Sequence, residues 1–365
     1  MKTVFRWFGP ENDPIPLKHI RQIPSVEGVV VTLPGFPVGE AWDEEKIAAL
    51  HKTVRGGGLT MEVVESVEVH EDIKLGAGKR DLYIENYAET LRRLSKFGVK
   101  AVCYNFMPVF DWTRSDLAYE LPDGSTVLYY DQGEIDKVTD PRQMAEDMKR
   151  SSGGAYMPGW DAEKLDRLIE LFELYKSVDG EKLFENYAYF LGKIIPVAEE
   201  CDIKMAVHPD DPPWNIFGLP RIVNNQKNIE RILRAVDSPY NGLTLCTGSL
   251  GSDPDNDLPA IIRRFGEAGL ADRIHFVHAR NVKIIKAGLF HESAHLSKSG
   301  SYDMYEIMKA LRDAGFDGYM RPDHGRMIWG ENGRPGYGLY DRAIGAEYLN
   351  GLWEAIVKSE EAGLR

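Results

Sequence analysis

Four residues that can bind a metal ion each stand at the end of a short apolar run. They are His208, Cys246, His278 and Asp323, and the run before His208, residues 205–207, is typical of them. Imidazole, thiolate and carboxylate groups are common ligands of divalent metals. One such residue alone is more often a core or helix-capping residue. Four of them at the same position in successive runs predict a shared metal site.

The mixture of nitrogen, sulfur and oxygen donors restricts the metal. It fits Mn²⁺, Fe²⁺, Co²⁺ or Zn²⁺ better than Mg²⁺ or Ca²⁺, which prefer oxygen ligands. Structural zinc sites usually draw on closely spaced cysteine pairs, whereas the cysteines here stand at 103, 201 and 246. Four protein ligands still leave a position open on a five- or six-coordinate ion. The ligand set therefore predicts a catalytic metal.

The elements that must position these residues alternate regularly along the chain. Eight apolar runs with nearly continuous hydrophobicity are typical of strands buried on both faces, and amphipathic segments with helical spacing lie between them. The runs are 3–8, 28–33, 60–65, 100–106, 204–208, 242–246, 273–278 and 318–323. The helical segments are 44–54, 81–97, 162–175, 183–200, 228–236, 258–268, 304–314 and 343–358.

This alternation predicts an α/β fold, a (β/α)8 TIM barrel that forms a single domain over residues 1–365. The carboxyl ends of all eight strands meet at one face of such a barrel, so the four ligands should converge there. Residues 108–179 interrupt the rhythm after the fourth strand. They are rich in Asp, Tyr, Trp, Gly and Pro and contain one clear helical segment. We interpret them as an inserted lid or oligomer contact on the catalytic face.

The composition restricts the partners and the compartment. The 365 residues carry a net charge of −13, which disfavours binding to nucleic acid or to anionic membranes. Three sparse cysteines form no disulfide framework, and we find no signal peptide and no apolar stretch of membrane-spanning length. These features predict a cytoplasmic protein whose partner is a small molecule.

Long strings of mixed polarity carry a resemblance over essentially the whole chain. They are FRWFGP at 5–10, YNFMPVFDWTR at 104–114, MAVHPDDPP at 205–213, LCTGS at 245–249, HARN at 278–281 and RPDHGR at 321–326. By these strings the chain resembles the mannonate dehydratases, lyases of hexuronate catabolism with a xylose-isomerase-like barrel.

The resemblance implies a reaction and residues for it. It implies loss of water from D-mannonate to give 2-keto-3-deoxy-D-gluconate, by removal of the C2 proton, a metal-stabilised enediolate and loss of the C3 hydroxyl. It implies one Mn²⁺ or Fe²⁺ held by the four ligands above, with His324 and Tyr337 as the acid/base pair. A homo-oligomer, namely a dimer, is also expected.

Other polar residues at the strand ends are weaker candidates. For substrate binding we single out Arg6, Trp7, Asn105, Arg280 and Arg326, and Arg280 could clamp a carboxylate with two nitrogens. Each could equally belong to a structural ion pair. Glu65 ends the third run. We interpret His275 as a structural residue. His291 and His295 have the i,i+4 spacing of a metal-binding pair, but residues 290–300 are predicted to form a loop, so this signal is weak.

Two alternatives remain open from the residues alone. A sugar isomerase or epimerase of the same barrel superfamily would also remove a proton beside a metal-bound oxygen, although such sites more often use carboxylate-rich ligands. A phosphodiester-cleaving barrel would need a basic groove and usually several metals, which the net charge of −13 argues against.

Overall fold

The apolar runs become the strands of a closed parallel barrel in the computed structural model, which describes residues 1–138 and 167–363. The strands are β1 (Lys2–Arg6), β2 (Val26–Val31), β3 (Thr60–Glu65), β4 (Ala101–Tyr104), β7 (Lys204–Val207), β8 (Asn241–Cys246), β9 (Ile274–Ala279) and β12 (Tyr319–Pro322). Around the barrel they follow the order β1-β12-β9-β8-β7-β4-β3-β2, and every neighbouring pair is parallel. The predicted TIM barrel is confirmed.

Burial on both faces explains the unbroken hydrophobicity of these strands. Every residue of β8 and of β9 is buried. Side chains that point inward fill the barrel with a small cluster that includes Val4, Val63 and Phe276. Side chains that point outward join a much larger core beneath the helices. The strand ends are therefore held on two sides, which fixes the side chains that follow them.

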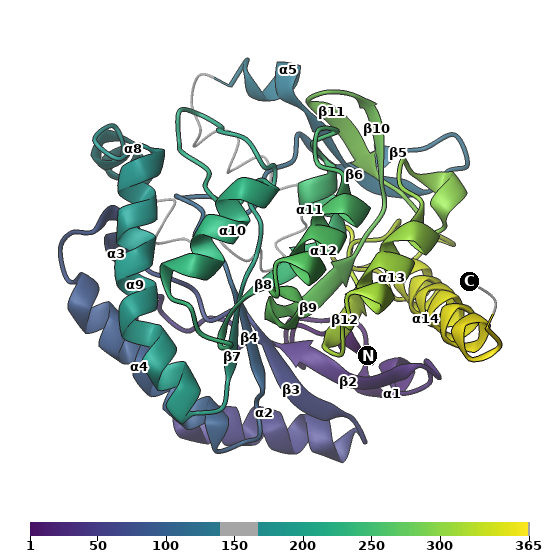
Figure 1. Ribbon diagram of the computed structural model, residues 1–365, viewed down its shortest axis with the longest axis horizontal. Coiled ribbons are helices and arrows are strands. Elements are labelled where there is room, and N and C mark those ends of the chain that lie inside the picture. The colour runs from purple at the N-terminus through teal and green to yellow at the C-terminus, as the bar shows by residue number, and fades with distance from the viewer. Residues whose placement is uncertain (139–166, 364–365) are drawn as a thin grey trace.

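Helices surround the barrel (Figure 1). The long ones are α2 (Glu44–Gly56), α4 (Arg80–Ser95), α9 (Gly180–Glu200), α10 (Gln226–Ala235), α12 (Leu258–Glu267), α13 (Met304–Asp313) and α14 (Leu339–Glu361). Each overlaps a predicted helix. The predicted helix 162–175 appears as α8 (Leu168–Tyr175), and its first residues lie outside the described ones. No described helix has the length and apolar character that crossing a bilayer requires.

A second, four-stranded sheet stands at the mouth of the barrel, at the upper right of Figure 1. Two of its strands, β5 (Asp116–Glu120) and β6 (Thr126–Asp131), come from the chain between β4 and β7. The other two, β10 (Val282–Lys286) and β11 (Leu289–Glu292), follow β9. The order is β10-β11-β6-β5, and all its neighbouring strands are antiparallel.

The sequence did not predict this sheet. Residues 290–300 were expected to form a loop, and this is wrong for the start of the segment, which pairs with β6 as β11. The strands β5 and β6 were also missed between residues 108 and 179. The pairing of β6 with β11 joins segments far apart in the chain, such as His291 with Tyr129, and no local periodicity encodes it, whereas β5–β6 and β10–β11 are hairpins of consecutive strands. Short helices were missed as well, namely α1 (Leu17–Ile20), α3 (Glu71–Leu75), α5 (Gln132–Ile135) and α11 (Thr247–Gly251).

Candidate metal centre and active site

The predicted ligands meet at the carboxyl ends of four neighbouring strands, β7, β8, β9 and β12. Ligand atoms of His208, Cys246 and His278 all lie within 4.8 Å of one another. Asp323 joins them, with its Oδ2 3.7 Å from the Sγ of Cys246 and 4.0 Å from the Nδ1 of His278. The structure therefore brings together all four side chains that the strand-end pattern singled out.

The local contacts of His208 leave one nitrogen facing the other ligands. Its Nδ1 lies 2.7 Å from the carbonyl oxygen of Pro209, and its Nε2 lies 3.1 Å from the Nδ1 of His278. A proton on Nδ1 that is donated to the carbonyl leaves a lone pair on Nε2. Burial lowers the pKa of His208, which favours the neutral imidazole that a metal needs.

The spacing of the donor atoms fits a divalent ion. Two nitrogens each about 2.1 Å from a shared ion would be about 3.0–3.4 Å apart, and the two imidazole nitrogens are 3.1 Å apart. Cys246 is the N-cap of α11, and its Sγ accepts from the backbone N–H and the hydroxyl of Ser249. Those two donors would stabilise a thiolate.

The carboxylate of Asp323 is also prepared for this role. Burial alone would raise its pKa, but Arg321, followed by His324 and His278, outweighs burial and lowers the pKa well below the ordinary value. Arg321 Nη2 lies 2.8 Å from Asp323 Oδ1, which leaves Oδ2 on the side of Cys246. The residues present therefore fit a site for one divalent metal.

A second group of potential ligands, Glu65, Cys103 and His278, shares one histidine with the first. It is a poorer site, because burial raises the pKa of the Cys103 thiol well above its ordinary value, and a protonated thiol is a weak metal ligand. The first group is therefore the better candidate for the metal site.

The predicted acid/base residues form a hydrogen-bonded pair next to the ligands. His324 Nε2 and Tyr337 Oη are 2.9 Å apart. The His324 Nδ1 lies 2.8 Å from Nη1 of Arg280 and 3.2 Å from Oε1 of Glu292. Burial, together with the charge of Asp323, raises the pKa of Tyr337 to about 12, so its hydroxyl holds a proton at neutral pH.

Two of the ligands, His208 and Asp323, line one open cavity of about 500 Å³ together with the acid/base pair. The described residues that line it are Arg6, Glu65, Ser66, Asn105, Asp111, Trp112, His208, Asp211, Arg280, Arg321, Asp323, His324 and Tyr337. Arg6, Asn105 and Arg280 were among the predicted substrate contacts. Trp7 packs in the core and donates its indole N–H to the carbonyl of Ile15. Arg326 pairs outside the cavity, with Asp123 and Asp341.

The guanidinium of Arg280 is held in a buried network at the cavity wall. It donates to Asp211 at 2.9 Å, to Ser249 at 3.0 Å and to Glu292 at 3.2 Å. Arg114 pairs with the same two carboxylates, at 2.8 Å and 3.0 Å. Arg114 precedes β5 and Glu292 ends β11, so this network attaches the second sheet to the barrel mouth.

Several residues of the site were not singled out from the sequence. Arg321 contacts Asp323 and Glu65, and it could have been found because it lies two residues before a predicted ligand on the same strand. Asp211 and Arg114 stood inside strings that we quoted, without a role. Trp112, in the same string as Arg114, was also given no role, and it lies beside His324, with ring centroids 6.2 Å apart.

The remaining histidines stand apart from the metal site. The two ring nitrogens of His275 each lie 3.0 Å from a carbonyl oxygen, of Met205 and of Pro239, as a structural role requires. His291 stacks on Tyr119 over the second sheet, whereas His295 is buried beside Gly345. The structure groups neither His291 nor His295 with other ligands among the described residues.

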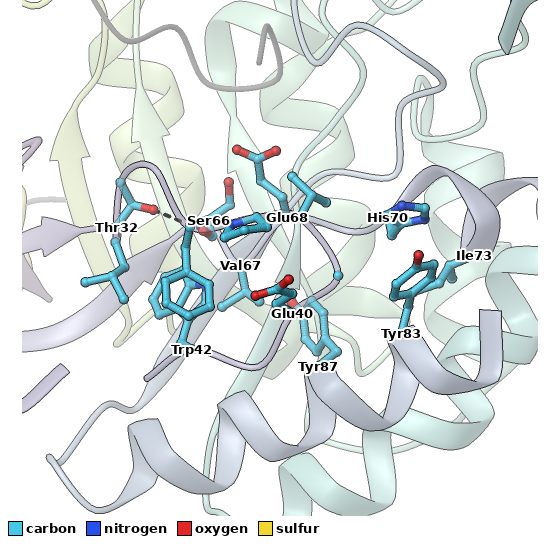
Figure 2. A pocket seen from close by; sticks show the side chains of 15 residues that line it. Thr32, Glu40, Trp42, Ser66, Val67, Glu68, His70, Ile73, Tyr83 and Tyr87 are labelled. Atoms are coloured by element: carbon cyan, nitrogen blue, oxygen red, sulfur yellow. Dashed lines mark hydrogen bonds between the residues drawn. The ribbon is translucent and has the colours of Figure 1, made fainter. Parts of the chain in front are cut away.

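A second cavity, of about 440 Å³, lies beside the first and is drawn in Figure 2. Its walls include the aromatic side chains of Trp42, Tyr83 and Tyr87. Ser66 lines both cavities, and its carbonyl accepts a hydrogen bond of 3.2 Å from Thr32 (Figure 2). None of the predicted site residues is among the described residues that line this second cavity.

Comparisons with known proteins point to one family. The model of the D-mannonate dehydratase (UxuA) family matches residues 1–362. The chain is 61% identical to the mannonate dehydratase of Thermotoga neapolitana over 361 residues, 99% of each chain. It is 55% identical to that of Geobacillus thermodenitrificans, over 98% of this chain and 95% of the relative.

Solved structures agree with the sequence relatives. The crystal structure of mannonate dehydratase from Streptococcus suis serotype 2 superposes with a TM-score of 0.88 at 45% identity, over 99% of this chain and 96% of that one. A D-psicose 3-epimerase from Clostridium cellulolyticum H10 matches with a TM-score of 0.53 at 14% identity, over the whole of both chains. At that identity the likeness shows the barrel fold alone.

Proposed function

The chain belongs to the D-mannonate dehydratase family, a family of hydro-lyases, and from this premise we propose that it converts D-mannonate to 2-keto-3-deoxy-D-gluconate in hexuronate catabolism. One observation carries the proposal beyond family membership. Two of the four converging ligands, His208 and Asp323, line the same cavity as the His324–Tyr337 pair, and Cys246 and His278 lie against them. A binding protein would need no such combination.

The reaction needs two proton transfers. The C2 proton is weakly acidic because the neighbouring carboxylate already carries negative charge, and the C3 hydroxyl leaves as water only if it gains a proton. His324 Nε2 and Tyr337 Oη, 2.9 Å apart, can serve both transfers from one side of a substrate. One of them takes the C2 proton and the other protonates the leaving oxygen.

The four ligands would hold one Mn²⁺ or Fe²⁺. When bound, such an ion acts as a Lewis acid toward the negative charge that develops on the substrate carboxyl oxygens. The chain itself supplies positive charge to an anionic substrate through Arg6 and Arg280, which line the cavity with Asn105. We propose these three as substrate contacts, and keep Trp7 and Arg326 as candidates that act from outside the cavity.

The decisive experiment is an assay of metal-reconstituted protein with D-mannonate. We expect a 2-keto-3-deoxy acid to form with Mn²⁺ or Fe²⁺, and less with Zn²⁺, after removal of endogenous metal. Product mass separates the alternatives, because a dehydratase product is lighter by one water and an isomerase product is not. A product of unchanged mass would replace the dehydratase proposal with a sugar isomerase.

Three wider features complete the proposal. The acidic composition and sparse reduced cysteines support a cytoplasmic enzyme with no nucleic-acid partner. We propose a homo-oligomer, namely a dimer. Light scattering of the protein as it elutes from a size-exclusion column would measure its molar mass and so test this. Residues 108–179 would serve as the lid or as the oligomer contact. Hydrogen exchange of the described part, 108–138 and 167–179, would distinguish these roles: a lid gains protection when substrate is added, whereas an oligomer contact is protected without it.

A further inference from the structure

The ring of His278 has a polar neighbour on each of its two edges. Its Nδ1 lies 3.1 Å from the Nε2 of His208, on the side of the other ligands. Its Nε2 lies 3.2 Å from Oε2 of Glu65. The side chain is buried, so water does not compete freely for either edge.

A neutral imidazole can present only one lone pair to a metal. The other nitrogen carries the proton, and the acceptor of that proton decides which nitrogen is available. Among the described residues, neither His278 Nε2 nor Glu65 Oε2 has a hydrogen-bond partner, and the two atoms lie 3.2 Å apart. Each is thus an unsatisfied polar atom within hydrogen-bond distance of the other, which makes Glu65 the natural acceptor for an Nε2 proton.

Glu65 reaches His278 from the far side of the barrel. It ends β3, whereas His278 lies on β9, and three strands separate β3 from β9 in either direction around the barrel. Arg321 holds the carboxylate in place, because its Nη2 lies 2.9 Å from Glu65 Oε1 and 2.8 Å from Asp323 Oδ1. One guanidinium thus connects Glu65 to the ligand Asp323.

We propose that Glu65 is a positioning residue that accepts the Nε2 proton of His278 and so turns the Nδ1 lone pair toward the metal. The inference rests on the metal-dependent function proposed above. It gives Glu65 a role without contact to the metal, and it explains why a second carboxylate stands beside a complete ligand set. Such partners of ligating histidines typically change metal affinity by about 10–100-fold.

The first test measures metal affinity in matched variants of the full chain. Glu65→Gln keeps the size of the side chain but removes the charge that holds the imidazole proton. Glu62→Gln is the control, since Glu62 lies on the same strand and pairs instead with Lys2 and Tyr319. Competition with a chelator should show Mn²⁺ affinity lowered about 10-fold or more in Glu65→Gln, and within twofold of wild type in Glu62→Gln.

Two further readouts distinguish positioning from general stability. The visible spectrum of Co²⁺-loaded protein should change in Glu65→Gln and not in the control, because it reports the ligand geometry. In Zn²⁺-loaded wild-type protein, ¹⁵N NMR of His278 should show metal on Nδ1 and a proton on Nε2. The NMR measurement needs no variant, so it decides the matter even if Glu65→Gln misfolds.

The proposal is overturned by metal on Nε2 of His278, or by a folded Glu65→Gln that keeps wild-type metal affinity and Co²⁺ spectrum. These measurements use the metal alone and no substrate. A failure to dehydrate D-mannonate would therefore count against the proposed function and leave this inference standing.

Discussion

At the scale of single residues, the chemistry depends on the contact between His324 and Tyr337. The two side chains are 13 residues apart in sequence and 2.9 Å apart in space. His324 is anchored by its neighbour Asp323 on the strand side and by Arg280 and Glu292 on its other nitrogen. The hydroxyl is the only polar group of the Tyr337 side chain, so removing this hydroxyl tests its role in catalysis directly.

We expect Tyr337→Phe to keep the metal and to lose turnover. Loss of a general acid or base typically costs roughly 10²–10⁴-fold, so kcat should fall by about 10²-fold or more with metal content unchanged. His324→Asn should behave alike, and the double variant should be little worse than either single one, because the two act as a pair. Tyr340→Phe, at an exposed tyrosine of α14, is the control. Near-normal kcat in Tyr337→Phe would remove Tyr337 from the mechanism.

Each metal ligand could be predicted from the sequence, but the residues that hold the site together through long-range contacts could not. Each ligand lies at or directly after the carboxyl end of a strand that local hydrophobicity reveals, so His208 and Cys246 could be found without a structure. Tyr337 lies in a glycine-flanked loop, and only the resemblance singled it out. Arg114 pairs with Asp211 and Glu292, which are 97 and 178 residues away. No pattern within a single element reports such a contact.

At the scale of elements, α11 must lie close against Arg280, the residue that directly follows β9. A Cβ at Gly248 would come within 1.7 Å of the Arg280 Nε, so Gly248→Ala must displace a guanidinium that contacts His324. A misplacement of about 1 Å can cost about 10²-fold in rate, and we expect a fall of that order in kcat/KM. Gly192→Ala in α9, where a Cβ meets nothing within 4 Å, should keep wild-type kinetics. Equal kinetics in the two variants would show that Arg280 does not position the pair.

The attachment of the second sheet to the barrel gives a stability prediction. Arg114 is fully buried between Asp211 and Glu292, and Arg114→Leu would leave these two buried carboxylates to share the single guanidinium of Arg280. Removal of one member of a buried ion pair typically costs about 3–5 kcal/mol, measurable as a lower free energy of unfolding in urea. The control Arg312→Leu breaks an exposed pair with Glu360 and should change little. A small effect for Arg114→Leu would mean that Arg280 alone compensates both carboxylates.

At the scale of the whole molecule, the barrel was the easier part to predict. Eight runs such as residues 242–246 alternate with amphipathic helices, and the closure of eight parallel strands follows from general rules. The assembly of the second sheet was missed because β6 pairs with β11, for example Asp131 with Leu289, although residues 132–288 lie between these two strands. The metal ligands could be predicted because they lie at strand ends of the barrel. The residues of the cavity wall that come from loops could not, because their contacts join distant parts of the chain.

Because the ligands come from four different strands, the metal should stabilise the whole barrel. The unfolded chain has no converged site, so binding favours the folded state by about 2.7 kcal/mol at a free metal concentration of 100 times Kd. For a chain of 365 residues this corresponds to a rise in Tm of about 3–4 °C. Calorimetry with Mn²⁺ and with a chelator should show this rise in the wild type. It should vanish in Cys246→Ser and persist in Cys201→Ser, which alters a half-buried cysteine at the end of α9. An undiminished rise in Cys246→Ser would place the stabilising metal elsewhere.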